Sequence, residues 1–187
     1  MYESSDIRKG LKIQMEGVPF VVVDFQFVKP GKGVAFTRTK LKNMTSGAVI
    51  ERTFRSGDKL EPADLEERQM QFLYMESGMY TFMDTANYDQ LQLTEEQLGE
   101  NRFYLKDGTM VEVLLFGVKP IGVTVPNFVE LKVVSTEPGY KGDTSAGVTK
   151  PATLETGLQI NVPLFVNQDE FIRLDTRTGE YSERVKK

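Results

Sequence analysis

The stretch KIQMEGVPFVVVDFQFV, residues 12–28, decides the fold of this chain. Apolar and polar residues alternate along it, as expected of strands with one buried face, and Glu16-Gly17 marks a hairpin turn. Short alternating segments between turn residues continue as far as EYSERV at residues 180–185. The sequence therefore predicts an all-β protein.

Polar turn segments indicate three small domains in a row. The segment SGDKLEPAD, residues 56–64, contains Gly and Pro and is suited to a linker. We expect a strongly bent SH3-like (KOW-like) barrel at residues 1–64, an OB-fold barrel at residues 65–127 and a second OB-fold barrel at residues 128–187.

The middle domain has the element order of an OB-fold, with a short helix after its third strand. The helix is predicted from LTEEQL, residues 93–98, where Thr94 and Gln97 have the spacing of a capping box. Glu95 and Glu96 lie at the N-terminus of this helix, where acids stabilise the helix dipole. This role explains them better than a catalytic pair does.

Composition excludes several kinds of chemistry. The 187 residues contain no Cys and no His, which excludes disulfides, thiolate nucleophiles and cysteine zinc sites and removes the commonest general base. We therefore expect no catalytic residues, no metal and no cofactor, although carboxylates or lysine alone can support catalysis. No apolar run has the length of a membrane span or of a signal peptide, which predicts a cytoplasmic protein without a membrane partner.

The net charge of -4 is unevenly distributed along the chain. Residues 1–64 carry 11 Lys and Arg against 8 Asp and Glu, whereas residues 65–127 carry 4 against 10. The first domain can face a polyanion that the second domain repels. Such polarity suits a protein that approaches nucleic acid in one orientation.

The stretch FVKPGKGVAFTRTK, residues 27–40, places a lysine at the tip of a predicted hairpin. Pro30 presets a turn, and Gly31 and Gly33 can adopt positive φ, so loop geometry explains these three residues. It does not explain Lys32, since almost any polar residue suits that position. Glycines on both sides leave this side chain without lateral neighbours, so it can enter a narrow cavity or the active site of a modifying enzyme.

Other roles for this loop fit the sequence less well. A P-loop would need Gly where Gln26 stands and Ser or Thr where Gly33 stands, and a dinucleotide fingerprint would need Gly where Phe36 stands. A Lys32 nucleophile that forms a Schiff base would need burial or a nearby cation. Lys29 is such a cation, but an exposed tip provides little desolvation.

A row of cations leads away from the loop. Side chains two apart on a strand share a face, so Arg38, Lys40 and Lys42 are predicted to project together. Such a row suits contacts with RNA-backbone phosphates, which position a protein without reading sequence. The alternative is an edge strand that carries charge to prevent aggregation. We favour RNA binding because the row continues from the basic tip.

Three segments are typical of one protein family. They are Lys29-Pro-Gly-Lys-Gly33 in a hairpin, KPATLETGLQINVPLF at residues 150–165 and FIRLDTRTGEYSERV at residues 171–185. With them, the whole chain resembles bacterial elongation factor P. Asp169 departs from the family pattern, which usually has glycine before an acidic residue; Asp tolerates positive φ better than most residues, so the turn can survive.

The resemblance implies a translation elongation factor that enters the ribosome between the peptidyl-tRNA and exit sites when synthesis of consecutive prolines stalls. In that family the first domain lies along the acceptor arm of peptidyl-tRNA, and the tip lysine, here Lys32, points to the CCA end. This lysine commonly carries a group attached by an enzyme. Positioning of the CCA end stimulates the peptidyl transferase of the ribosome, so the factor itself is not an enzyme.

The resemblance also assigns residues in the last domain. Gly142, Asp143 and Thr144 match a loop that approaches the exit-site codon, and Tyr181 and Arg184 match positions that face the small subunit and tRNA. The implied partners are both ribosomal subunits, peptidyl-tRNA, mRNA near the exit site and a lysine-modifying enzyme. The protein itself is expected to be a monomer.

A generic single-stranded nucleic-acid-binding OB-fold protein is the alternative function. Proteins of that class need base-stacking aromatic residues in a basic groove. The acidic middle domain has aromatic residues in alternating patterns, which indicates packing roles, at Phe72, Tyr74, Tyr80 and Phe82.

Overall fold

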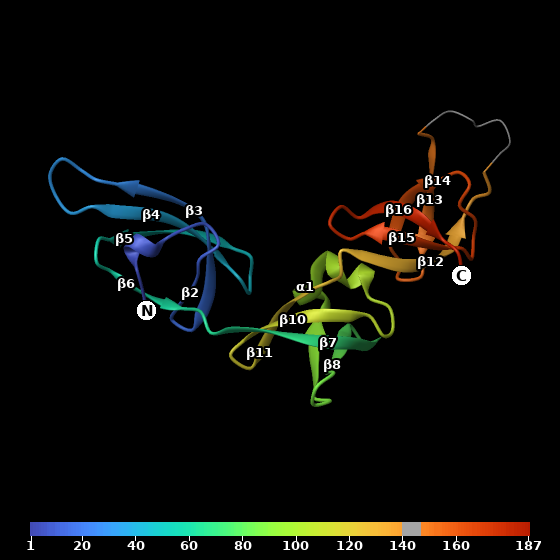
Figure 1. The fold of residues 1–187 in the computed structure, drawn as a ribbon, viewed down its shortest axis with the longest axis horizontal. Helices are drawn as coiled ribbons and strands as arrows, with labels where there is room; N and C mark the ends of the chain where they lie inside the picture. The colour runs from blue at the N-terminus through green and yellow to red at the C-terminus, as the bar shows by residue number, and fades with distance from the viewer. Residues whose placement is uncertain (140–146) are drawn as a thin grey trace. The chain divides into compact units, whose positions relative to one another are not determined.

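Three β-sheets make up residues 1–139 and 147–187, the part of the chain that the computed structural model describes (Figure 1). The predicted all-β fold of three small domains is confirmed. By packing, the chain divides into two compact units, residues 1–67 with 114–122 and residues 68–113 with 123–187. The predicted domain limits at residues 64 and 127 stay a prediction.

The N-terminal sheet has the strand order β1-β6-β2-β3-β4-β5. Its elements are β1 (Tyr2–Glu3), η1 (Ser4–Asp6, a 3-10 turn), β2 (Lys12–Met15), β3 (Val18–Val28), β4 (Phe36–Asn43), β5 (Val49–Arg55) and β6 (Lys59–Pro62). The hairpin expected at Glu16-Gly17 joins β2 to β3, and both residues have positive φ. The linker predicted at residues 56–64 is wrong in part, because β6 lies within it, pairs with β1 and β2 and buries Leu60 in the core.

The core of this sheet comes from its alternating faces. Its buried side chains include Ile13 on β2, Val22 on β3 and Leu41 on β4, each at most 2% exposed. Burial of one such side chain stabilises the fold by about 1.5–3 kcal/mol. The core therefore fixes which face of the β3–β4 hairpin points outward.

The middle sheet has the order β11-β10-β7-β8-β9. Its elements are β7 (Leu65–Glu76), β8 (Met79–Asp84), β9 (Gln90–Thr94), α1 (Glu95–Leu98), η2 (Gly99–Tyr104), β10 (Met110–Phe116) and β11 (Lys119–Thr124). The predicted capping box is confirmed: the Gln97 backbone N–H donates to Thr94 Oγ1 at 3.2 Å, and the Thr94 N–H donates to Gln97 Oε1 at 2.9 Å.

The C-terminal sheet has the order β14-β13-β12-β15-β16. Its strands are β12 (Phe128–Thr136), β13 (Thr149–Leu154), β14 (Gln159–Pro163), β15 (Phe171–Asp175) and β16 (Glu180–Val185). Asp169, the departure from the family pattern, has φ of 69°, so the aspartate does adopt the conformation that glycine favours.

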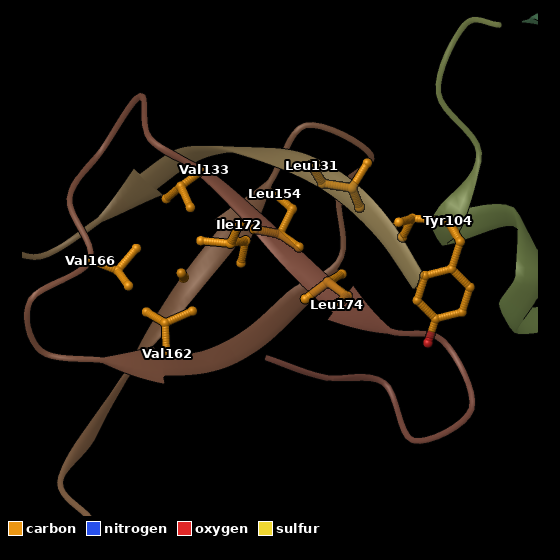
Figure 2. Packing of buried hydrophobic residues seen from close by; sticks show 10 residues of the cluster. Tyr104, Leu131, Val133, Leu154, Val162, Val166, Ile172 and Leu174 are labelled. Carbon is orange, nitrogen blue, oxygen red and sulfur yellow. The ribbon is translucent and has the colours of Figure 1, made fainter. Parts of the chain in front are cut away.

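Tyr104 of η2 joins the core of the C-terminal sheet, where it packs beside Leu131 and Leu174 (Figure 2). The Thr156 hydroxyl also donates to the Phe103 carbonyl oxygen at 2.6 Å. The sequence did not indicate this docking, which explains why the middle and C-terminal sheets contribute to one compact unit.

Candidate nucleic-acid interface

The β3–β4 hairpin carries the predicted tip loop at its end (Figure 1). The two strands pair from Phe20 opposite Asn43 to Val28 opposite Phe36, with an irregularity between Val22 and Asp24. A long, twisted hairpin of this kind projects its loop from the core that anchors it. Residues 29–35 form the loop and lie outside the regular pairing.

Lys32 is exposed at this loop. Its side chain makes no hydrogen bond or ion pair with any residue that the structure describes. The two flanking glycines differ, because Gly33 has φ of +105° whereas Gly31 does not have positive φ. A Cβ atom at Gly31 would meet nothing within 4 Å, so the turn needs Gly33 and leaves Gly31 free to keep the tip narrow.

Burial along β4 alternates as predicted. The exposed side chains are Arg38, Lys40 and Lys42, and the buried ones are Thr37, Thr39 and Leu41. The three cations therefore share the outer face of the hairpin, and they continue from the loop that holds Lys32.

The cations of this row differ in their neighbours. Lys40 lies in register between Asp24 on β3 and Glu51 on β5, whereas Arg38 lies between uncharged Gln26 and Thr53. Asp24 also lies 3.8 Å from the Lys9 ammonium, so local neutralisation of the Lys40 charge rests mainly on Glu51 across the sheet. The Arg38 guanidinium instead lies 5.7 Å from the centre of the Phe36 ring.

The hairpin also presents apolar surface beside its tip loop, which the sequence did not reveal. Phe27 and Val34 are each 62% exposed. Phe27 lines a hollow of about 260 Å³ together with Phe25 and the hydroxyl side chain of Ser56. Phe25 packs against the core of the sheet while Phe27 is largely exposed, and no local pattern in the sequence distinguishes the two.

Tyr181 and Arg184 lie close together on β16. Regular alternation would put residues three apart on opposite faces, but the register shifts between Arg173 and Leu174, so that Glu183 and Tyr181 become successive partners. Burial raises the pKa of the Tyr181 phenol, while the charge of Arg184 and its backbone N–H oppose that rise. The predicted pair is thus brought together by an irregularity that the sequence does not disclose.

The Arg184 side chain has two neighbours of its own. Its Nη1 atom lies 3.5 Å from Glu170 Oε2, and its guanidinium lies 5.0 Å from the centre of the Phe165 ring. Phe165 was not predicted as a site residue. The resemblance pointed to the segment that contains it, but no local pattern marks its ring as exposed.

Gly142, Asp143 and Thr144 fall outside the described residues. The residues on either side of that segment are firmly held. Lys150 is buried, at 7% exposed, and its ammonium donates to the Glu137 carbonyl oxygen. The Thr136 hydroxyl donates to the Pro151 carbonyl oxygen at 2.9 Å.

The described residues contain no group of three acidic side chains placed to hold a metal ion. Neither α1 nor any other helix described is long and apolar enough to cross a membrane.

Solved structures share part of this arrangement of small β-sheet domains. The eukaryotic translation initiation factor 5A from Methanococcus jannaschii matches with a TM-score of 0.54 and 24% identity, over 67% of this chain and 92% of that one. At that identity the likeness establishes the fold alone.

Family models match the chain in three consecutive parts. They describe the elongation factor P KOW-like domain at residues 3–60, its OB domain at residues 65–123 and its C-terminal domain at residues 129–184. Elongation factor P 2 of Geobacter sulfurreducens is 53% identical over 100% of both chains, and elongation factor P of Syntrophus aciditrophicus is 55% identical over 100% of both. The chain belongs to the elongation factor P family and is a translation elongation factor.

Proposed function

We propose that this factor binds the ribosome between the peptidyl-tRNA and exit sites and relieves stalling at consecutive prolines. In this proposal Lys32 reaches the CCA end of peptidyl-tRNA and holds it in position. The observation that carries the proposal is the exposed, unpaired Lys32 at a narrow tip, in a chain of the elongation factor P family.

The proposed mechanism is entropic. Proline is a constrained and poor nucleophile, so a stalled peptidyl-tRNA samples unproductive geometries. Restriction of the CCA end to near-attack geometry can lower the barrier by several kcal/mol, within the roughly 7–11 kcal/mol that orientation supplies in favourable cases. The ribosome supplies the chemistry, so the factor stimulates the peptidyl transferase without being an enzyme.

The proposal gives the loop residues separate roles. Lys29, Pro30, Gly31 and Gly33 shape the tip, and an enzyme-attached group on Lys32 lengthens its reach. Exposure of Lys32 between two glycines supports access for such an enzyme. Intact-mass measurement of the protein from its host is expected to show an added group, and an unmodified yet active protein would contradict an obligatory modification.

The remaining contacts in this proposal are those that membership of the family suggests. Arg38, Lys40 and Lys42 contact the RNA backbone of the acceptor arm, and Tyr181 and Arg184 face the small subunit and tRNA. Gly142, Asp143 and Thr144 approach mRNA in the exit site. The proposal includes domains at residues 1–64, 65–127 and 128–187, and a monomer in the cytoplasm with no membrane partner.

The test is replacement of Lys32 by Ala, with Lys12→Ala on β2 as the matched control of another exposed lysine. We expect Lys32→Ala to abolish rescue of a Pro-Pro-Pro reporter without altering the melting temperature. The control is expected to retain rescue. Unchanged rescue by the Lys32 variant would remove the central role of this residue.

The alternative of a generic single-stranded nucleic-acid-binding protein has weaker support. Phe72, Tyr80 and Phe82 are buried, with Phe72 5.8 Å from Tyr80 and 5.5 Å from Phe82 between ring centres, so these rings are not available to stack on bases. The packing role predicted for Tyr74 is wrong, because that residue is 47% exposed. Tight binding of poly(U) in the absence of ribosomes would favour this alternative.

A further inference from the structure

Phe165 holds an unusual position in the C-terminal sheet domain. Its side chain is 56% exposed, although the next residue, Val166, is fully buried in the core (Figure 2). The Val166 N–H also donates to the Pro163 carbonyl oxygen at 3.1 Å, which closes a tight turn around Phe165. This turn therefore places the ring at the surface beside a buried neighbour.

The exposed ring supports the guanidinium of Arg184. The Arg184 Cζ atom lies 5.0 Å from the ring centre, a distance at which a cation is attracted to an aromatic face. The contact from Arg184 Nη1 to Glu170 Oε2 is long, at 3.5 Å. Among the described residues, no partner is found for the Arg184 Nε edge, the edge that binds carboxylate or phosphate in a bidentate manner.

A second arginine of the same domain provides a natural comparison. Arg177 lies 5.4 Å from the centre of the Phe128 ring, and Phe128 is 46% exposed. Its Nε and Nη2 atoms, however, donate to the two Asp175 carboxylate oxygens at 3.0 and 2.9 Å. The same aromatic support is present, but the bidentate edge of Arg177 is already occupied.

Space for a ligand lies beside Arg184. A hollow of about 520 Å³ is lined by Arg184, Lys186 and Lys187 together with Asp169, Glu170 and Phe171. Lys187 is engaged with Glu130 at 3.6 Å and with the Phe171 ring at 4.3 Å. Arg184 thus faces an open, partly cationic hollow with its strongest binding edge unused.

We infer that Phe165 is a positioning residue that holds the Arg184 guanidinium flat for one phosphate of an RNA backbone. The inference rests on the proposed function, because the ribosome is where this domain would meet RNA. A phosphodiester fits the site because an arginine edge recognises paired phosphate oxygens in a fixed plane. The phosphate belongs either to tRNA or to ribosomal RNA, and both present the same chemistry.

The experiment measures the affinity of the full-length factor for ribosomes stalled at consecutive prolines, over a series of salt concentrations. Phe165→Leu keeps an apolar side chain but removes the aromatic face, so it is the informative variant, with Phe165→Ala beside it. Arg184→Gln is expected to reduce the slope of log K against log salt by about one unit. Phe165→Leu is expected to weaken binding about twofold to fivefold, as loss of an exposed cation–π contact predicts.

A double-mutant cycle separates positioning from a structural role. The Phe165→Leu change is expected to have no further effect once Arg184 is Gln, because the ring acts through that arginine. Phe128→Leu is the matched control and is expected to leave affinity unchanged. The inference would be overturned if the effects of Phe165→Leu and Arg184→Gln on affinity multiplied in the double variant. It would also be overturned if Phe165→Leu bound ribosomes as tightly as the wild type.

Two further comparisons complete the test. A loss on tRNA-programmed ribosomes alone identifies a tRNA phosphate, and a loss on vacant ribosomes as well identifies ribosomal RNA. Absence of ribosome binding by the wild-type factor would overturn the proposed function itself. Full binding by Arg184→Gln, with rescue still lost in Lys32→Ala, would overturn only this inference.

Discussion

Lys32 and Lys150 are the same residue type in opposite surroundings. Lys32 is exposed and meets no partner among the described residues, whereas Lys150 is buried and donates to the Glu137 carbonyl oxygen. A buried ammonium requires a hydrogen-bond acceptor to compensate for lost hydration, so Lys150 serves the fold. An exposed ammonium without a described partner has no such role in the fold, which agrees with the outside partner that we propose for Lys32.

Replacement of Lys32 and Lys150 by alanine is expected to give the largest difference between an effect on function and an effect on stability. Lys150→Ala is expected to lower the free energy of unfolding by about 1–3 kcal/mol, because the change removes a buried bond to a carbonyl group. Lys32→Ala is expected to cost no stability and to abolish rescue. Stability is measured by chemical denaturation monitored with circular dichroism, and rescue is measured with a Pro-Pro-Pro reporter.

The contrast between the lysines would fail in two ways. Partial unfolding of Lys150→Ala would also reduce rescue, so the reporter assay is run well below the melting temperature of this variant. An unfolding curve for Lys150→Ala that overlays the wild-type curve would show that the Glu137 contact does not stabilise the fold. Loss of stability in Lys32→Ala would show an intramolecular partner for the tip.

Glycines near the same two segments sharpen the contrast. A Cβ atom at Gly139 would lie 2.5 Å from the Leu164 carbonyl oxygen, whereas one at Gly31 would meet nothing within 4 Å. We expect Gly139→Ala to destabilise the protein by about 1–3 kcal/mol, since the backbone must move to admit the methyl group. Gly31→Ala is expected to leave the melting temperature unchanged, and thermal unfolding of both variants tests this pair.

Gly33→Ala provides the internal control for the tip. Its φ of +105° strains any residue with a Cβ atom, so a small loss of stability is expected even though space is available. A Gly139→Ala protein as stable as wild type would show that the segment before residue 140 shifts freely.

Local patterns in the sequence predicted much of this structure. The two-residue period identified the buried Thr37 and Leu41 faces of β4, and the Thr94 and Gln97 spacing identified the capping box. Both signals arise from neighbours within a few positions, where strand geometry and backbone hydrogen bonding leave few alternatives.

Features that depend on distant neighbours could not be predicted in this way. Tyr104 packs into the core of the C-terminal sheet, and the position of Phe165 beside Arg184 depends on the folding of the whole domain. The irregularity that brings Tyr181 and Arg184 together leaves Ser182 of β16 without a partner in the pairing with β15. Long-range packing, not local propensity, decides all three.

Arg38 and Lys40 in the cation row also differ in how many opposite charges lie near them. Arg38 has uncharged neighbours across the sheet, whereas Lys40 lies between Asp24 and Glu51. We expect Arg38→Gln to reduce the salt dependence of ribosome binding by about one unit of slope, and Lys40→Gln to reduce it less. Binding titrations at several salt concentrations measure both slopes, and equal slopes for the two variants would contradict local neutralisation.

The smallest effect is expected from the ion pairs on the outer face of the C-terminal sheet. A hydrogen bond from Arg173 lowers the pKa of the Glu130 carboxyl below its ordinary value, against the opposing effect of desolvation. A carboxyl whose pKa is lowered by folding stabilises the native state above its unfolded pKa, and this stabilisation disappears as pH falls through the folded pKa. We therefore expect the melting temperature to decrease slightly when the pH falls below the range in which glutamate normally titrates. This decrease is expected to be absent in Arg173→Met. Because exposed ion pairs contribute little, a large decrease that persists in Arg173→Met would place the acid sensitivity elsewhere in the chain.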